Sequence, residues 1–207
     1  DPYACLDTVL TKALAHIYVD KIMSSSCADL CVIEHKLIPV ILKMEEGGLR
    51  IDLDYINQLL REFRVEQRFI QDEIYNIVGR PIEVSSGKQL QEYLYDRLKI
   101  NPPKETKTGQ RSVDEDSLLK INHPIGTKVC ELVLRWRELD KLCSTYLEPY
   151  KDLSKGRVHP HWNATGARTG RFSSSSPNLQ NIPKNEKMRR IFIPDNEFYD
   201  FDFSQVE

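Results

Sequence analysis

The feature that most constrains the fold of this sequence is an amphipathic stretch between about residue 53 and residue 78. Its large apolar residues recur at intervals of three, four or seven positions, which places them on one face of an α-helix. They are Ile56, Leu59, Phe63, Ile70, Ile74 and Ile77. The opposite face is predicted to carry Arg61, Arg64, Glu66, Arg68 and Asp72. A long helix with so narrow an apolar stripe favours an antiparallel arm over a compact core helix, and either Asp52 or Asp54 is suited to cap its start.

Helical patterns also surround this stretch. Further helices are predicted at about 4–22, 28–46, 88–98 and 126–150, and a capping box at 112–115 opens a short one. Gly47-Gly48 ends the second of these helices, and Ser85 or Ser86 can cap the helix at 88. Beyond Gly156 the pattern changes to strands and polar loops, including an alternating strand at 198–203 with its aromatic side chains on one face. The predicted fold class is therefore α+β, with a helical arm up to 150 followed by the start of a sheet domain.

The composition excludes some classes of protein. Hydrophobic residues make up 40% and charged residues 29% of the 207 positions, an ordinary globular balance. No apolar run approaches the roughly 20 residues of a membrane span, and the start of the chain lacks the features of a signal peptide. We expect a cytoplasmic protein that is not secreted, and a numbering that begins inside a longer protein because Met is absent at position 1. Cys27-x3-Cys31 is either half of a metal site or, with the other three cysteines, a set of reduced thiols.

The net charge of −2 conceals an uneven distribution. Residues 151–193 carry nine Lys and Arg against Asp152 and Glu186, a net charge of +7, whereas residues 194–207 carry five carboxylates and no cation. A basic surface beside an acidic pocket suits a protein that binds a phosphate backbone and a divalent metal, although solvated faces also carry such runs.

Four motifs closely resemble those of family A DNA polymerases, the DNA polymerase I type. Two resemble thumb segments: Ser85-Ser86-Gly87-Lys88-Gln89-Leu90, and Arg137-x3-Lys141-Leu142-x-Ser144-Thr145-Tyr146. The other two, 166–183 and Asp202-Phe203-Ser204-Gln205-Val206-Glu207, are similar to the palm entry and the first metal-binding motif. The resemblance implies an exonuclease-like tail at 1–26, a helical thumb with its connection to the palm at 27–156, and the start of an antiparallel palm-type sheet at 157–207.

The resemblance also implies a set of DNA-binding residues. They are Lys88, Arg137, Lys141, Ser144, Thr145, Arg168, Thr169, Arg171, Ser173, Ser174, Asn178, Gln180, Asn181 and Arg189. Arg137 and Lys141 are four residues apart, so they share a helix face in reach of successive phosphates. In the family, the residue that matches Arg171 reaches the minor groove, where every base pair offers acceptors in similar places. The punctuation of 166–183 by glycine and proline predicts neither strand nor helix, and the alternative to a DNA contact is a surface loop closed by its own Asx turns.

The last motif implies the chemistry. By resemblance, Asp202 is catalytic and binds Mg²⁺ in a two-metal site, with the Phe203 carbonyl as a further oxygen ligand. Ser204, Gln205 and Glu207 would bind the nucleotide, with Glu207 filling the space of a ribose 2′-OH. Asp200 is expected to be a local charge rather than a ligand, and Lys184 is the nearest candidate for a phosphate-binding residue after Pro183. The alternative for Asp202 is a cap at the end of a strand.

The opening of the chain offers a weaker pattern. Tyr3-x3-Asp7 resembles the third motif of a 3′–5′ exonuclease, but amphipathic core helices also contain this spacing. The earlier exonuclease motifs are absent from the sequence, so exonuclease activity is not expected from it.

The function implied is that of part of a DNA-directed DNA polymerase in replication or repair, at a nucleoid or in a viral replication complex. Its partners would be primer–template DNA, dNTP and a C-terminal polymerase portion, from the same gene or a second chain, without which it would be inactive. Two alternatives stay open: a standalone, non-catalytic primer–template-binding module, and a helical scaffold unrelated to polymerases.

Overall fold

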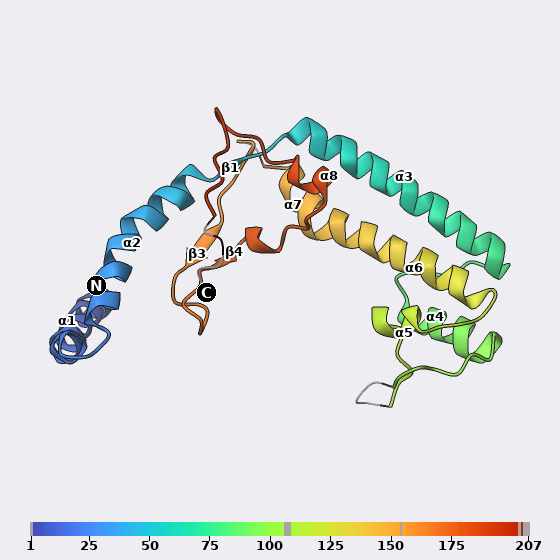
Figure 1. Ribbon diagram of the computed structural model, residues 1–207, viewed down its shortest axis with the longest axis horizontal. Coiled ribbons are helices and arrows are strands. Elements are labelled where there is room, and N and C mark those ends of the chain that lie inside the picture. Colours follow the sequence, from blue (N-terminus) through green and yellow to red (C-terminus); the bar gives the residue numbers. More distant parts are fainter. Residues whose placement is uncertain (1, 106–108, 154, 203, 205–207) are drawn as a thin grey trace. The chain divides into compact units, whose positions relative to one another are not determined.

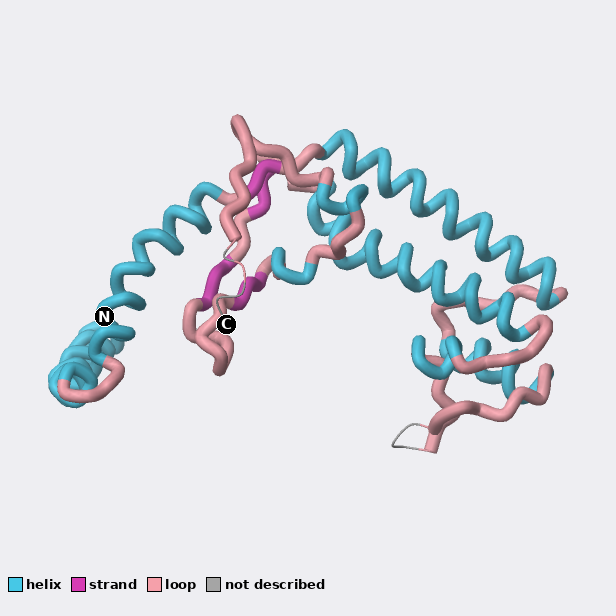
Figure 2. The backbone as a smooth tube through the Cα atoms, in the orientation of Figure 1, coloured by secondary structure: helices cyan, strands magenta, loops and turns pink. Residues whose placement is uncertain are grey.

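The computed structural model describes residues 2–105, 109–153, 155–202 and 204 of the chain. Three predicted site residues, Phe203, Gln205 and Glu207, lie outside these described residues. The chain divides into two compact units, one formed by residues 51–156 and 185–195 and the other by 1–50, 157–184 and 196–207 (Figure 1). Most elements are helices, and the described strands form two small antiparallel sheets (Figure 2). The predicted α+β class is therefore confirmed.

The unit that begins at Ile51 is built on two long helices. Helix α3 (Leu53–Val78) runs antiparallel to α6 (Gly126–Lys141), side by side with it along its length (Figure 1). Helix α6 continues through the wider π-helix η2 (Leu142–Leu147) into α7 (Glu148–Lys151). The predicted stripe of α3 packs inward from Ile56 to Ile74, whereas Ile77 is only half-buried and Val78 completes the buried face. The described core also includes Leu90, Leu94, Leu118, Val129, Val133, Leu139, Leu147 and Tyr150. The antiparallel arm predicted from the stripe is therefore present.

Side chains fix the ends of the long helix. Asp52 is the cap of α3, since its Oδ1 accepts a hydrogen bond from the Tyr55 amide at 2.9 Å. At the other end Gly79 adopts φ +75°, a left-handed conformation that glycine reaches without strain from a Cβ.

A group of short helices lies near the C-terminal end of α3 (Figure 1). It consists of α4 (Gly87–Gln91), the π-helix η1 (Glu92–Arg97) and α5 (Glu115–Leu119). Ser86 caps α4, as one of the two alternatives predicted. The capping box predicted at Ser112 is wrong, because Ser112 is buried and Asp114 takes that place. The Asp114 carboxylate accepts from the Ser117 amide at 2.9 Å, and the Ser117 contacts lower the pKa of this carboxyl.

The other unit holds α1 (Pro2–Met23) and α2 (Ala28–Gly47), followed by β1 (Leu49–Arg50). Strand β1 pairs antiparallel with β2 (Arg157–Val158), with Leu49 opposite Val158. Strand β3 (His161–Asn163) pairs with β4 (Ser173–Ser175), and the 3₁₀-helix η3 (Leu179–Asn181) follows. The last helix, α8 (Glu186–Arg189), belongs to the unit that contains α3 and α6, and its Met188 is buried.

Two sequence predictions for this part of the chain are wrong. The segment 166–183 was expected to contain neither strand nor helix, yet β4 forms there because the backbone of Ser173–Ser175 meets a partner in β3. The strand predicted at 198–203 is absent over its described residues, which form neither helix nor strand. No described segment pairs with these residues, and an unpaired strand gains no ladder hydrogen bonds. The aromatic side chains of Phe198, Tyr199 and Phe201 are accordingly exposed.

Over the described residues, no helix combines the length and the apolar content that a bilayer crossing requires.

Candidate nucleic-acid interface

The hairpin loop between β3 and β4 presents cationic and hydroxyl side chains to solvent. Arg168, Thr169 and Arg171 are all exposed in it. A Cβ at Gly166 would come within 2.3 Å of the Ser173 Oγ, so a larger residue there would require the Ser173 side chain to move. Gly170 adds a left-handed turn with φ +75° immediately before Arg171. Gly170 therefore gives the loop a left-handed turn that a residue with a Cβ would adopt only with strain.

Ser174 holds the next part of the loop from inside. Its side chain is buried, donates to the Pro177 carbonyl and accepts from the Leu179 amide, both at 3.2 Å. Its amide donates to Gln180 Oε1 at 3.2 Å, and Gln180 Nε2 donates to the Phe172 carbonyl at 2.8 Å. Ser174 and Gln180 therefore position the loop backbone, and their polar atoms are engaged within the chain.

An Asx turn also closes this segment, as the alternative reading of the sequence predicted. Asn178 Oδ1 accepts from the Gln180 amide at 3.0 Å and caps η3. A similar turn forms at Asn163, whose Oδ1 accepts from the Thr165 amide at 2.9 Å. Asn178 and Asn181 are exposed on η3. The Asx turns leave Asn178 and Asn181 exposed, so the presence of these turns does not exclude a DNA contact.

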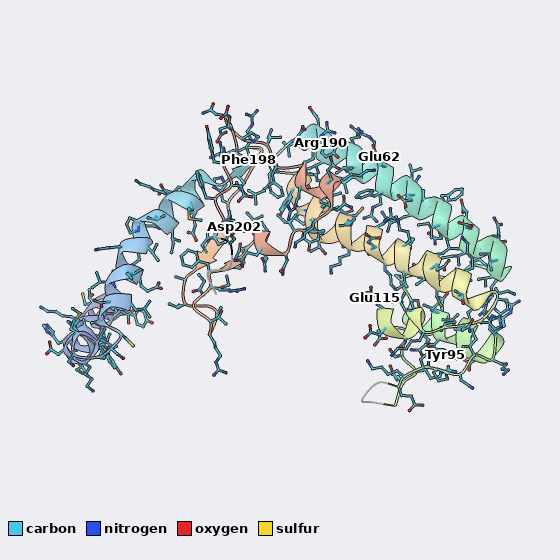
Figure 3. The ribbon with its side chains drawn as sticks, viewed as in Figure 1. Glu62, Tyr95, Glu115, Arg190, Phe198 and Asp202 are labelled. Carbon is cyan, nitrogen blue, oxygen red and sulfur yellow. The ribbon has the colours of Figure 1, made fainter. Side chains whose placement is uncertain are left out.

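The acidic end of the chain is open to solvent. Asp200, Asp202 and Ser204 are all exposed (Figure 3 labels Asp202 and Phe198). Carboxylate oxygens are the ligands that Mg²⁺ prefers, so the chemistry of Asp202 fits this ion. Among the described residues, however, no three His, Cys, Asp or Glu side chains gather as a metal site would require. Asp202 can thus contribute one carboxylate to a site, and the described residues do not assemble the rest.

The cysteines stay separate from any such cluster. All five are free thiols, with Cys130 and Cys143 buried. Cys31 lies beside His35, with 3.6 Å between Sγ and Nδ1, and no third ligating side chain joins them within the described residues.

In the other unit, Arg137 and Lys141 line one groove of about 600 Å³ beside α5 and α6. Arg137 is only half-exposed, and its Nη1 donates to the Val113 carbonyl at 2.7 Å, which ties α6 to the start of α5. Burial lowers the pKa of this guanidinium. Lys141 is exposed. The two predicted phosphate contacts therefore share a groove, but the Lys141 side chain can reach a ligand more freely than Arg137, which is bonded to Val113.

The other predicted contacts in this unit are surface residues. Lys88 on α4, Thr145 on η2 and Arg189 on α8 are exposed. Ser144 is exposed as well, but its Oγ donates to the Asp140 carbonyl at 2.7 Å. Tyr3 and Asp7 lie one turn apart on α1, both exposed, and their exonuclease origin stays a prediction.

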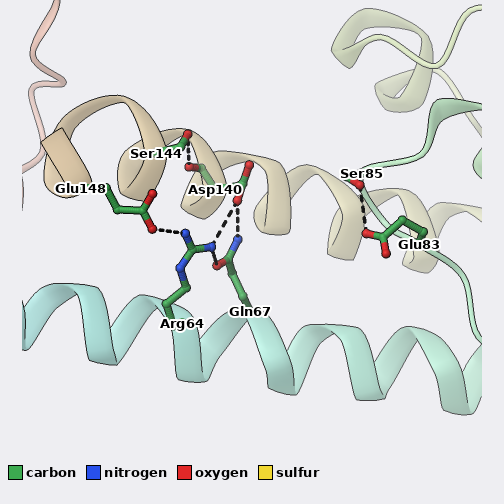
Figure 4. A network of polar contacts seen from close by, with 7 residues as sticks. All are labelled: Arg64, Gln67, Glu83, Ser85, Asp140, Ser144 and Glu148. Atoms are coloured by element: carbon green, nitrogen blue, oxygen red, sulfur yellow. Dashed lines mark hydrogen bonds and ion pairs between the residues drawn. The ribbon is translucent and has the colours of Figure 1, made fainter.

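One polar network was missed in the sequence. Arg64, predicted to face away from the stripe, instead reaches α6 and α7, where it pairs with Asp140 at 3.4 Å and with Glu148 (Figure 4). Gln67, which is buried, accepts from Arg64 Nη1 at 2.8 Å and donates to Asp140 at 3.3 Å. The hydrogen bond to Glu148 raises the pKa of Arg64. The available signal was Gln67 itself, a polar residue four positions after Phe63 on the apolar stripe.

The sequence model of DNA polymerase family A matches residues 53–207, three quarters of the chain. The chain belongs to DNA polymerase family A. The match includes the arm, the loop after β3 and the Asp202 segment.

Curated relatives of this family A chain are bacterial DNA polymerases I. It is 37% identical to the thermostable DNA polymerase I of Thermus filiformis over 187 residues. This aligned region covers 84% of the chain and 22% of the relative. It is 34% identical to the DNA polymerase I of Chloroflexus aurantiacus, over 100% of the chain and 23% of the relative. The chain therefore spans less than a quarter of the length of these relatives.

A solved structure shares the fold. It is the POL domain of Pol1 from M. smegmatis in complex with DNA primer–template and dNTP, 37% identical with a TM-score of 0.64. The similarity covers 73% of this chain and 27% of that one.

Proposed function

We propose that this chain is the thumb and palm-entry part of a DNA-directed DNA polymerase that acts in replication or repair, at a nucleoid or in a viral replication complex. The observation that carries the proposal is the family match over residues 53–207, which includes both the helical arm and the loop with its exposed cations. The similar POL domain of M. smegmatis, solved with primer–template and dNTP, supports a role in binding those ligands.

The proposed DNA contacts divide by chemistry. Lys88, Lys141 and Arg189 are exposed cations suited to phosphates, which fix the position of a duplex without reading its sequence. Arg168 and Arg171 extend from the loop that Ser174 and Gln180 hold in place, and Arg171 is assigned to the minor groove near the primer terminus. Ser174 and Gln180 act as positioning residues rather than contacts in this proposal, because their polar atoms are engaged within the loop.

Asp202 is assigned as one carboxylate ligand of Mg²⁺. Two Mg²⁺ ions held in such a site would supply activation of the primer 3′-OH and neutralisation of charge on the triphosphate during phosphoryl transfer. Ser204 is exposed two residues further on, where it can contact the incoming nucleotide. The second carboxylate and the binding groups for the triphosphate would come from a C-terminal polymerase portion, since a single Asp does not supply enough oxygen ligands to hold both ions. That portion also supplies a cover for Phe198, Tyr199 and Phe201, which are exposed.

Primer extension tests this assignment. The chain is assayed on a primed template with Mg²⁺ and dNTPs, alone and after addition of the C-terminal portion of a family A relative. We expect extension only in the mixture. Asp202→Asn in the mixture should reduce the rate by about 100-fold or more, because the stabilisation from a metal ligand is worth several kcal/mol.

Two controls separate the functional alternatives. Asp200→Asn, an equivalent change two residues away, should keep most of the activity. Equilibrium binding of primed duplex should survive Asp202→Asn but weaken in the double variant Arg168→Ala/Arg171→Ala. Binding without extension in any mixture would favour the standalone DNA-binding module, and extension by the chain alone would refute the need for a second portion. If the chain showed no salt-dependent binding to primed duplex, the result would favour the remaining alternative, a helical scaffold without DNA binding.

A further inference from the structure

Charge is segregated between the two flanks of α3. On one flank Glu62, Glu66 and Glu73 each pair with a cation of a neighbouring segment: Lys187 at 3.5 Å, Arg135 at 2.8 Å and Lys128 at 3.6 Å. The three carboxylates of this flank are therefore paired with cations of α6 and α8. The acidic flank is therefore explained by the packing of the unit.

The other flank is basic and mostly uncommitted. Arg61, Arg64 and Arg68 are spaced by three and four residues, so they form a row along one side of the helix. Only Arg64 is paired, to Asp140 and Glu148. Arg61 and Arg68 are exposed and form no ion pair with a described residue, and the same is true of Lys151 on α7.

These cations line one groove. Its volume is about 400 Å³, and its wall contains Arg61, Arg64, Arg68 and Lys151 against the single carboxylate of Glu148. Four cations and one carboxylate give the wall a net charge of +3. The groove shares no residue with the one that contains Arg137 and Lys141, so it is a separate surface from the proposed primer–template contact on α6.

An exposed aromatic residue adjoins the basic row. Phe69 is 67% exposed and lines a second hollow of about 560 Å³ together with Arg61 and Val65. Glu62 and Glu66 also line this hollow, and their carboxylates are paired with Lys187 and Arg135. Arg61 and Val65 line both hollows, so the two are continuous on the surface of α3. Asp72, one turn beyond Arg68, is a further exposed carboxylate on the same helix.

We propose that the flank of α3 formed by Arg61, Arg68, Phe69 and Lys151 binds single-stranded nucleic acid. Arg61 and Arg68 are seven residues apart, about 10 Å along a helix, which suits an extended polyanion better than one small anion. A basic row beside an exposed aromatic ring is the combination that holds unpaired strands, because the backbone follows the cations while a base stacks on the ring. The natural source is the unpaired template strand, an identification that rests on the proposed function.

The test measures binding of a labelled mixed-sequence single strand to the whole chain over a range of salt concentrations. Arg61→Glu/Arg68→Glu should lower the affinity by about tenfold or more and reduce the log–log salt slope by about 1.4, since each lost phosphate contact removes about 0.7. The matched control is Arg80→Glu/Lys120→Glu, which makes the same charge change at two exposed residues of the same unit. The control should change affinity less than the Arg61/Arg68 variant.

Phe69→Ala separates stacking from charge. It should weaken single-strand binding by about fivefold or more and leave binding of a blunt duplex of equal length unchanged, because only unpaired bases can stack on the ring. Leu119→Ala, which truncates another exposed apolar side chain, is its control and should leave both affinities unchanged. Circular dichroism verifies that the variants are folded, as expected for exposed positions.

Three results would overturn the inference. The first is an equal affinity of the Arg61/Arg68 variant and its control for the single strand. The second is an equal loss of single-strand and blunt-duplex binding in Phe69→Ala. The third is an Arg61/Arg68 variant that loses binding to a poly-glutamate peptide but keeps its binding to the single strand. The last would assign the groove to an acidic peptide. Arg168→Ala/Arg171→Ala, measured on primed duplex, reports on the proposed function separately, so either idea can fail while the other survives.

Discussion

The arm formed by α3 and α6 and the loop between β3 and η3 keep their shapes by different means. In the arm, apolar side chains such as Leu59 and Leu139 are buried between elements, and charged side chains lie on the flanks. In the loop, the side chains of Ser174, Asn178 and Gln180 bond to backbone groups a few residues away. The arm therefore depends on packing, whereas the loop depends on polar side chains that a motif search assigns to ligand binding.

This difference teaches that similarity to a binding motif does not separate contact residues from the residues that hold them. Arg168 and Arg171 are exposed, while Ser174 in the same motif is buried. The polar residues of the motif thus fall into two groups that only geometry distinguishes.

The largest expected effect is on the packing of the arm. Leu59 is fully buried on α3, so Leu59→Ala should reduce the free energy of unfolding by about 2–5 kcal/mol in a urea titration. Val65→Ala, on the same helix but 64% exposed, should change it by no more than about 0.5 kcal/mol. Similar losses for the two variants would mean that the stripe does not carry the stability of the arm.

A smaller effect is expected in the loop. Ser174→Ala removes the acceptor of the Leu179 amide and the donor to Pro177, which should cost about 1–3 kcal/mol locally. Hydrogen exchange of the Leu179 amide should accelerate, and affinity for primed duplex should fall although Ser174 is buried. Ser175→Ala, at the exposed neighbouring position, provides the control. Unchanged exchange at Leu179 would show that the loop is held by other contacts.

The smallest effect at neutral pH concerns the thiols of the two units. Burial raises the pKa of Cys130 on α6 to about 12, whereas Cys5 on α1 is exposed. Because the folded pKa lies above the ordinary value of 9.0, the contribution of this thiol to stability is complete below pH 9 and declines as pH rises toward 12.

Variants that retain a single cysteine allow the measurement. With only Cys5 the folded chain should react rapidly with Ellman's reagent at pH 8, and with only Cys130 it should react only after unfolding in urea. Fast reaction of Cys130 in the folded state would mean that the interior of the arm opens readily.

Much of the arm could be predicted from the sequence, because the relevant signals are local. The spacing of Ile56, Leu59 and Phe63 sets the buried face of α3, and Asp52 caps its start as its chemistry favours. Outside the arm, Gly48 likewise ends α2. Gly166 also lies in a loop, as the sequence predicts, whereas strand β4 nearby is not predicted.

Two of the predictions that failed depended on partners distant in the sequence. Alternating aromatic residues at 198–203 predict a strand, but a strand also requires a neighbour, and no described segment pairs with the described part of it. Arg64 was assigned to the outer face of its helix from spacing alone, yet Asp140 and Glu148, 76 and 84 residues later, draw it toward α6 and α7.

The sequence by itself determined that this chain forms a helical arm, that it belongs to the polymerase lineage its motifs resemble, and which of its residues are cationic or acidic. Helical periodicity, capping and motif order are properties of neighbouring residues, so the chain carries them without its fold. Only the tertiary structure decided that Ser174 is buried, that the acidic flank of α3 is paired and that Arg61 and Arg68 form no ion pair with a described residue. Burial and pairing depend on which segments meet in space, and that information is held in no single stretch of the sequence.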